Sequence, residues 1–252
     1  MIDLFSDLDN TLIYSHRAQL NTEKVLAERL DGSEQSYMTA RTLKFLQSAP
    51  DLRLIPVTTR SKEQFTRIAL FQTQLPCHYA LVCNGGELLV NGEPDPQWFA
   101  ETQELTAPAM DALREGAALM ESILGPGKEV RIPSGLMACA VFEDPAAAVE
   151  KLRAKINTPA LSILRVNRKV YCIPSVMHKG AAVERFKARC QTGTIVTAGD
   201  SIFDIPLLEA GDYAITNRKL AASVRNQNTV PIEDDLILSD EICTIIAKII
   251  ST

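Results

Sequence analysis

The fold is decided by the start of the chain, where residues 2–11 read IDLFSDLDNT. The apolar run Ile2–Phe5 predicts a short buried strand, which stops abruptly at a loop that holds Asp7 and Asp9. Outward from this stretch, further strands are expected at 52–57, 79–83, 194–198, 212–216 and 230–232, and helices at 38–47, 62–71, 179–190, 205–210 and 241–249. Apolar strands that alternate with helices are typical of a parallel sheet covered on both faces. The sequence therefore predicts an α/β core.

The middle of the chain, residues 91–174, has a different pattern. A helix is expected at 108–124, and another at 145–156 with Asp144 as its N-cap. Strand patterns occur at 129–132, 136–142, 161–166 and 169–173, the last two joined by a turn at Asn167-Arg168. We interpret 91–174 as an inserted α+β domain, with the core formed by 1–90 and 175–252.

Composition excludes several classes of function. Lys and Arg number 26 against 31 Asp and Glu, a net charge of −5, which argues against non-specific binding to nucleic acid or to anionic membranes. The N-terminus lacks the pattern of a signal peptide, and no apolar run approaches the ~20 residues of a membrane span. Six scattered cysteines are expected to be buried apolar residues in a reducing compartment. We therefore expect a cytoplasmic protein, with its oligomeric state open.

Polar residues gather where the core strands end. Ligands of open α/β sheets bind beyond the carboxyl ends of the strands, so these residues are the candidates for a site. Asp3, within the first strand, is expected to be solvated, and the polar segment 15–35 is expected to lie over the site entrance. The candidates are Asp7, Asp9, Thr58, Thr59, Arg60, Lys179, Asp200 and Asp204.

These residue types suit phosphoryl transfer. Asp7 and Asp200 offer the hard oxygen ligands that Mg²⁺ prefers, and a carboxylate can also be the nucleophile that forms an aspartyl-phosphate. Asp9 is placed to protonate the leaving oxygen and then to activate water. Lys179 and Thr58 can stabilise the charge on the phosphoryl oxygens.

In this order, the motifs around Asp7, Thr58, Lys179 and Asp200 resemble those of the haloacid-dehalogenase-like (HAD) phosphatases. The insert between the Thr58 and Lys179 motifs, with Asn84-Gly85-Gly86, is similar to the type-2 caps of the Cof-like and sucrose-phosphatase-like branch. The chain departs from many Cof-like members at Phe203, where they have Asn.

The resemblance implies a Rossmann-like three-layer core and assigns roles to the motif residues. It implies Asp7 as nucleophile, Asp9 as acid/base, and Thr58, Thr59, Arg60, Lys179 and Asn84 as phosphate or substrate ligands. It also implies Mg²⁺ held by Asp7, Asp200 and the Asp9 carbonyl. Asp204 is expected to support the metal, to cap a helix, or to do both, and Arg60 to bind substrate or to cap a loop.

The leading hypothesis is a Mg²⁺-dependent phosphomonoester hydrolase acting on a small phosphorylated metabolite, either a sugar phosphate or a nucleotide-related compound. The insert is expected to act as a substrate-selecting lid. Three alternatives stay open: a phosphotransferase or mutase of the same superfamily, a phospho-accepting signalling module, and a non-catalytic metal-binding protein.

Overall fold

In the computed structural model, which describes residues 1–250, the first strand is part of a five-stranded parallel sheet. The order is β14-β13-β12-β1-β5, and every neighbouring pair is parallel. The strands are β1 (Ile2–Ser6), β5 (Leu52–Pro56), β12 (Thr194–Gly199), β13 (Tyr213–Asn217) and β14 (Thr229–Ile232). This sheet confirms the predicted α/β core.

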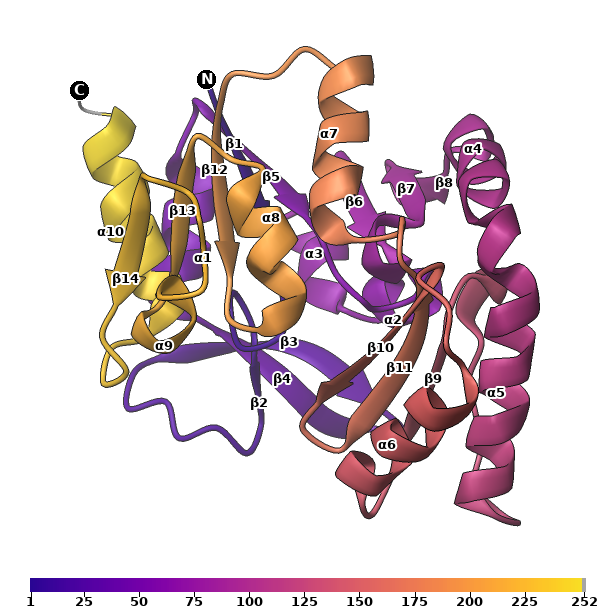
Figure 1. Ribbon diagram of the computed structural model, residues 1–252. Coiled ribbons are helices and arrows are strands. Elements are labelled where there is room, and N and C mark those ends of the chain that lie inside the picture. The colour runs from indigo at the N-terminus through magenta and orange to yellow at the C-terminus, as the bar shows by residue number, and fades with distance from the viewer. Residues whose placement is uncertain (251–252) are drawn as a thin grey trace. The chain divides into compact units, whose positions relative to one another are not determined.

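Helices cover both faces of this sheet (Figure 1). Leu4 of β1 belongs to a buried cluster with Leu43 of α1 (Ala40–Ser48) and Ile242 of α10 (Leu238–Ile250). The next residue, Phe5, points the other way, and its ring lies 5.3 Å from that of Phe186 in α7 (Lys179–Arg189). Successive residues of a strand face opposite sides of the sheet, so β1 is buried between two helical layers. The predicted three-layer arrangement is confirmed.

The remaining core elements lie around this sheet. The predicted helix at 62–71 is in fact two short helices, because Ile68 between them has ψ 88°, which is outside the helical range. A parallel bridge between Val57 and Leu81 joins β6 to the chain just after β5. These elements are α2 (Lys62–Thr66), α3 (Ala69–Thr73), β6 (Tyr79–Val82), β7 (Glu87–Val90), β8 (Glu93–Pro94), α8 (Ile205–Glu209) and α9 (Arg218–Ala221).

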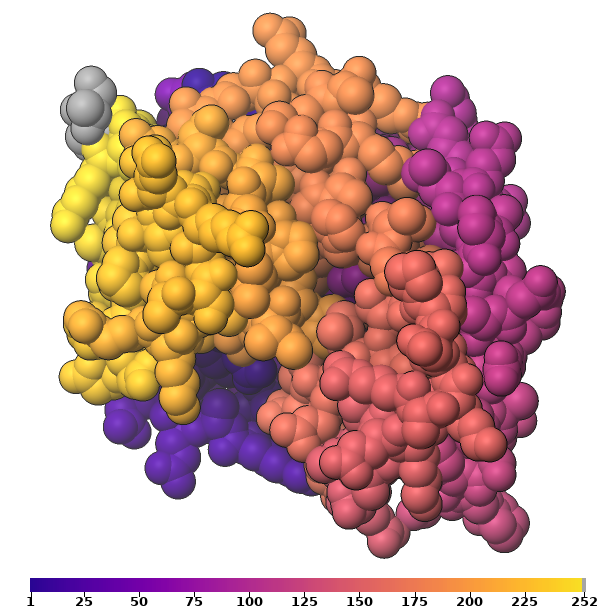
Figure 2. Space-filling view, in the orientation of Figure 1, coloured from indigo at the N-terminus to yellow at the C-terminus, as the bar shows by residue number. Residues whose placement is uncertain are grey.

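The polar segment expected over the site is a small antiparallel sheet of order β2-β4-β3. Its strands are β2 (Tyr14–Ser15), β3 (Lys24–Leu30) and β4 (Ser33–Thr39). Asp31 (φ 50°) and Gly32 (φ 77°) form the turn between β3 and β4. Because β4 continues to Thr39, which caps α1, that helix begins two residues later than predicted. Indigo residues of this N-terminal part are visible at the surface (Figure 2).

The prediction that Asp3 is solvated is wrong. Its side chain is fully buried, and Oδ1 lies 2.6 Å from Nε of Arg53 on the neighbouring strand β5. Oδ2 accepts a hydrogen bond from the backbone N–H of Gly193 at 2.8 Å. A buried charge requires such partners, so Asp3 is a structural residue that connects the start of β1 with its neighbours.

The second compact unit consists of Pro96–Met177, and the first of Met1–Asp95 and His178–Thr252. The second unit has its own apolar core, which includes Met120, Leu152 and Cys172. Its antiparallel sheet has the order β10-β11-β9. The elements are α4 (Pro96–Thr106), α5 (Met110–Leu124), β9 (Ala138–Val141), α6 (Pro145–Lys155), β10 (Leu161–Val166) and β11 (Lys169–Pro174). The sequence predicts this insert at 91–174.

Two details of this unit differ from the prediction. Helix α4 was not predicted, and the expected strand at 129–132 is reduced to a single bridge between Arg131 and Cys139. The N-cap at Asp144 and the β10–β11 hairpin are as predicted; Asp144 accepts from the N–H of Ala147 at 3.0 Å, and Asn167 has φ 53° in the turn. Among the described residues, no helix is both long and apolar enough to cross a membrane.

Candidate active site

The carboxyl ends of β1 and β12 bring Asp7 and Asp200 together. These strands are adjacent and parallel, and the backbone N–H of Asp7 donates to the carbonyl of Ala198 at 2.9 Å. The hydroxyl of Thr11 lies between the two carboxylates, 3.5 Å from Oδ2 of Asp7 and 3.3 Å from Oδ1 of Asp200. The sequence pattern alone assigns no role to Thr11, although this residue belongs to the first motif. The predicted meeting of these two motifs is therefore present in the structure.

Asp204 completes an acidic cluster with Asp7 and Asp200, in which one oxygen of each carboxylate lies within 4.8 Å of the others. Oδ2 of Asp204 accepts hydrogen bonds from the backbone N–H of Asp200 at 3.1 Å and of Ser201 at 2.9 Å. The Ser201 hydroxyl donates to the same oxygen at 2.9 Å. A Cβ at Gly199 would lie 2.3 Å from Cβ of Asp204, so this close approach requires glycine. Asp204 therefore organises its own loop and also faces the cluster.

The Lys179 ammonium lies among these carboxylates. Its Nζ atom is 2.5 Å from Oδ1 of Asp7 and 2.5 Å from Oδ1 of Asp204. Lys179 is the first residue of α7, an unfavourable place for a cation with respect to the helix dipole. Its side chain is almost completely buried, which excludes an ordinary surface lysine. Two charge-assisted hydrogen bonds offset this placement.

Burial and mutual charge set the protonation of the cluster. Burial raises the pKa of Asp200 to about 6, and the Asp204 carboxylate adds to this rise. Burial also raises the pKa of Asp7, although the Lys179 ammonium opposes the effect. Burial on its own lowers the pKa of Lys179, but the carboxylates of Asp204 and Asp7 together outweigh it and raise that pKa. One ammonium thus faces three carboxylates.

This donor set fits a divalent cation. The carboxylate oxygens are hard ligands of the kind that Mg²⁺ prefers, and they exceed the neighbouring positive charge. The structure differentiates the three acids, because Asp204 already makes four hydrogen bonds or ion pairs through its two oxygens. Asp7 and Asp200 are therefore the acids best suited to bind a metal directly, with Asp204 in support.

Thr58 follows β5 at the same edge of the sheet and is fully buried. Its backbone N–H donates to Leu81 at 2.8 Å, and its carbonyl accepts from the N–H of Asn84 at 2.8 Å. Asn84 and its neighbours Cys83 and Gly85 all have positive φ, at 59°, 50° and 89°. Three such residues in succession form a strained loop, of a kind concentrated at functional sites. The structure thus brings Asn84 next to Thr58.

The same loop packs against the helix that carries Lys179. A Cβ at Gly85 would lie 2.3 Å from Cβ of Ala182 in α7, so a larger residue would force the loop and the helix apart. The hydrogen bond from Cys83 N–H to the carbonyl of Arg60, at 2.7 Å, ties the loop to the Thr58 motif as well. The Asn84 loop therefore connects the motifs that contain Thr58 and Lys179. Phosphate binding by Thr58, Thr59, Asn84 and Lys179 stays a prediction.

Asp9 lies at the exposed side of the site and is paired with Arg60. Nε of Arg60 is 2.9 Å from Oδ2 of Asp9, and Nη2 is 2.7 Å from Oδ1, so the guanidinium binds both carboxylate oxygens. The Asp9 side chain is 51% exposed, whereas that of Arg60 is only 14% exposed. The sequence left two roles open for Arg60, substrate binding and capping of a loop. The structure adds a third role, which is contact with the predicted acid/base Asp9.

Sequence reasoning missed two further charged residues near Arg60. Nη1 of Arg60 lies 2.9 Å from Oε2 of Glu28, and Nε of Arg67 lies 2.6 Å from Oε1 of the same carboxylate. Glu28 belongs to β3 and is buried, although it lies in a segment that reads as polar loop. No local spacing in the sequence connects these residues.

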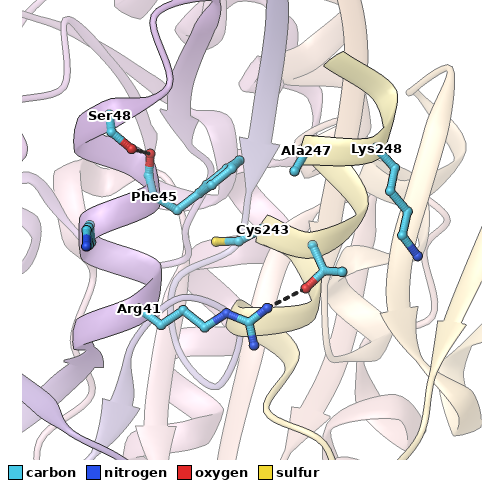
Figure 3. Close-up of a pocket in the computed structure, with 8 residues that line it drawn as sticks. Arg41, Phe45, Ser48, Cys243, Ala247 and Lys248 are labelled. Atoms are coloured by element: carbon cyan, nitrogen blue, oxygen red, sulfur yellow. Dashed lines mark hydrogen bonds between the residues drawn. The ribbon is translucent and has the colours of Figure 1, made fainter. Parts of the chain in front are cut away.

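A separate groove of about 730 Å³ lies between α1 and α10 (Figure 3). Arg41, Phe45, Cys243 and Lys248 are among its lining residues, and Arg41 donates to the hydroxyl of Thr244 at 2.8 Å. None of the predicted site residues lines this groove. It is therefore not part of the acidic site.

Comparison with solved structures identifies the fold. The sucrose-phosphatase of Synechocystis sp. PCC6803, solved in complex with sucrose and phosphate, matches with a TM-score of 0.65 and 17% identity over 98% of this chain and 97% of that chain. The HAD subclass IIB sugar phosphatase BT4131 matches with a TM-score of 0.65 and 14% identity over 99% of both chains.

A further HAD phosphatase, BT1666 from Bacteroides thetaiotaomicron, matches with a TM-score of 0.55 and 16% identity over 95% of this chain and 93% of that chain. No family model matches the sequence, and no curated protein does. The likeness is thus one of fold, and it extends over nearly the whole chain, insert included. The HAD-like fold expected from the four motifs is confirmed.

Proposed function

We propose that this chain, which has the fold of the HAD phosphatases, is a Mg²⁺-dependent phosphomonoester hydrolase that works through an aspartyl-phosphate on Asp7. The observation that carries the proposal is the buried cluster in which Lys179 contacts Asp7 and Asp204 beside Asp200. A nucleophile, a cation for phosphate and a set of metal ligands are thereby combined at the ligand-binding edge of the sheet.

The first step transfers the phosphoryl group to the protein. An Oδ atom of Asp7 attacks phosphorus, and the bond between phosphorus and the leaving oxygen breaks. The electron pair of that bond passes to the leaving oxygen, which takes a proton from Asp9. The products are an alcohol and the aspartyl-phosphate.

The second step returns Asp7 to its starting state. Asp9, now a carboxylate, removes a proton from a water molecule, and the water oxygen attacks phosphorus. The bond between phosphorus and Oδ of Asp7 breaks, which releases inorganic phosphate. In both steps Lys179 and Thr58 are expected to bind the phosphoryl oxygens, with Thr59 and Asn84 as further donors.

The metal would be held by Asp7 and Asp200 with the backbone carbonyl of Asp9, while Asp204 orients the loop of Asp200. When bound, Mg²⁺ would supply positive charge to the transferring phosphoryl group. The excess of carboxylates over the single ammonium supports this assignment.

A sugar phosphate is the substrate class that we favour. The fold neighbours include a sucrose-phosphatase and a sugar phosphatase, each with a high share of both chains aligned. We further propose that residues 96–177 form a cap that selects the substrate. Nucleotide-related phosphates are the second substrate class to be tested.

Release of inorganic phosphate from a panel of sugar phosphates, nucleotides and p-nitrophenyl phosphate tests the proposal. We expect steady release with Mg²⁺, no requirement for an acceptor alcohol, and loss of release in Asp7→Asn. Turnover only when an acceptor is added would identify a phosphotransferase or mutase instead. A labelled phosphoprotein that forms without releasing phosphate would identify a signalling module.

A further inference from the structure

Glu28 is a buried carboxylate that joins two arginines. Its side chain is 2% exposed; Oε2 lies 2.9 Å from Nη1 of Arg60, and Oε1 lies 2.6 Å from Nε of Arg67. The Ser36 hydroxyl donates to Oε2 at 3.3 Å. With Asp9 on the other side of Arg60, the charges alternate along Asp9, Arg60, Glu28 and Arg67 and sum to zero.

Two irregularities of the β3–β4 pairing place Glu28 here. Leu26 is opposite Tyr37 but Glu28 is opposite Ser36, so Ala27 is an extra residue in β3. A second shift, between Glu28 and Arg29, skips Gln35 of β4 and so restores the original register of the two strands. As a result Ala27 and Glu28 are both buried, although neighbours in a regular strand face opposite sides. Such bulges commonly redirect a side chain beside an active site.

Arg60 divides its donors between Glu28 and Asp9, with a longer contact of 3.4 Å from Nη1 to the carbonyl of Gln64. Nε and Nη2 form a fork on the two Asp9 oxygens, while Nη1 donates to Glu28. The fork fixes the plane of the Asp9 carboxylate relative to the guanidinium. Because Asp9 is half exposed and Glu28 is buried, the guanidinium is anchored at the Glu28 end.

We propose that Glu28 is a positioning residue: it holds Arg60, and Arg60 orients Asp9 toward the leaving oxygen. One Asp9 oxygen leaves the fork when it exchanges a proton with that leaving oxygen. This inference rests on the proposed function in so far as Asp9 is the acid/base. It gives the β2-β4-β3 sheet a role in the reaction, because Glu28 of this sheet holds Arg60 in place beside Asp9.

Stability alone does not account for this arrangement. Burying a carboxylate costs free energy that its partners only partly return, and apolar residues of similar volume often stabilise a protein as well or better. Glu28 moreover binds a guanidinium that forms a two-point contact with Asp9. A positional function explains both facts.

The first experiment compares Glu28→Gln with the wild type on two substrates of different leaving group. A sugar phosphate expels an alkoxide that requires a proton, whereas p-nitrophenyl phosphate expels a stable anion. We expect kcat/KM for the sugar phosphate to fall about 10-fold, a fraction of a full acid/base contribution, and that for p-nitrophenyl phosphate to fall less than about 2-fold. A merely structural role would lower both values alike. Equal losses, or no loss, would overturn the proposal.

Two further variants sharpen this comparison. Arg60→Lys keeps the positive charge but loses the fork, so we expect the same selective loss, and this variant decides the question if Glu28→Gln does not fold. Glu34→Gln is the matched control, because Glu34 lies in β4 of the same sheet and pairs with Arg29 at the surface. The ratio of the two kcat/KM values should not change in this control.

A crystal structure of Glu28→Gln separates this inference from the proposed function. We expect the Arg60 guanidinium and the Asp9 carboxylate to lose their single paired orientation. If the pair keeps the geometry of the wild type, Glu28 does not position it, whatever the kinetics. If the wild type hydrolyses no phosphate ester, the proposed function fails, and the crystal structure alone then decides whether Glu28 anchors Arg60.

Discussion

Nζ of Lys179 lies 2.5 Å from Oδ1 of Asp7, although 172 positions of sequence separate the two residues. The contact joins the first residue after β1 to the first residue of α7. An ammonium at this distance opposes the rise in pKa that burial imposes on Asp7, and so works in favour of the ionised carboxylate, which is the nucleophilic form. The same ammonium is bonded to Asp204, so Asp7, Lys179 and Asp204 form one charged unit.

Replacement of Asp7 by Asn is expected to abolish turnover, by on the order of 10⁴-fold or more, because an amide does not form the phosphoenzyme. The fold should persist, since Lys179 keeps its contact with Asp204. The measurements are phosphate release and the unfolding midpoint. Asp31→Asn, at an exposed turn with φ 50°, is the matched control and should retain full activity. Wild-type turnover in Asp7→Asn would refute the nucleophile assignment.

Removal of divalent metal with EDTA should abolish activity, and Mg²⁺ should restore it, whereas Ca²⁺ should inhibit. Calcium takes a larger and looser coordination shell than the near-octahedral one of Mg²⁺. Mg²⁺ should also raise the unfolding midpoint, since a ligand that binds only the native state stabilises it by about 2.7 kcal/mol at 100 times its Kd. Full activity of the metal-free protein would contradict the metal assignment.

Asp200→Asn and Asp204→Asn should fail in different ways. Asp200→Asn is expected to raise the Mg²⁺ concentration for half-maximal activity at least about 10-fold, with little loss of stability. Asp204→Asn should lower the free energy of unfolding by about 2–4 kcal/mol, because an amide NH₂ would face the donors that Asp204 now accepts. Mg²⁺ titrations and denaturant unfolding of both variants measure the difference. Interchanged phenotypes would make Asp204 the direct metal ligand.

Protonation of His178 should destabilise the start of α7. Its Nδ1 accepts the N–H of Ala181 at 3.1 Å as the helix N-cap, and burial lowers the pKa of this imidazole from 6.5. The unfolded state therefore binds the proton more readily, so stability is complete above about pH 6.5 and is lost as the pH falls through the lowered native pKa. We expect a loss of about 1 kcal/mol, the usual size of a cap.

Denaturant unfolding at several pH values, with His178→Asn beside the wild type, measures this contribution. Asparagine is also a good N-cap but does not titrate, so the variant should show a smaller fall in stability below pH 6.5. Identical pH profiles for the two proteins would show that His178 does not carry the effect.

Local sequence signals were sufficient for the framework of the site. Asp7 and Asp200 each follow an apolar run, and adjacent parallel strands present their carboxyl ends at one edge, so their meeting was predictable. Asp204 was expected to cap the helix that follows it, to support the metal, or to do both. Its side chain makes no capping hydrogen bond to α8 and instead accepts from the loop before it and from Lys179. Each of these predictions required only the positions at which strands and helices begin or end.

The Glu28 network was not predictable, because it depends on tertiary contacts and on broken periodicity. An extra residue at Ala27 disrupts the alternation by which β3 would have been recognised as a strand. Glu28 and Arg60 are 32 positions apart, with no motif that connects them. Asp3 was misjudged for a related reason: its partner Arg53 lies on a neighbouring strand, which the sequence of β1 does not reveal.

Replacement of residues 96–177 by a short Gly/Ser linker tests the cap. All the residues named above for the site lie in the other unit, and the excised unit has its own apolar core. We therefore expect the shortened protein to fold and to bind Mg²⁺, and its turnover of p-nitrophenyl phosphate to persist in part. Discrimination among sugar phosphates should fall, because the side chains that distinguish them would be gone.

The decisive quantity is the spread of kcat/KM over the substrate panel. Contacts with one methylene group are worth roughly 10–200-fold in specificity, so loss of a selecting cap should compress a wide spread to within about 10-fold. The unfolding midpoint with and without Mg²⁺ is the control, since it reports whether Asp7 and Asp200 still form the metal site. If the folded, metal-binding protein keeps the ranking and the spread of the intact chain, then the core unit selects the substrate. The β2-β4-β3 sheet, which already reaches Asp9 through Glu28 and Arg60, would then be the segment to vary next.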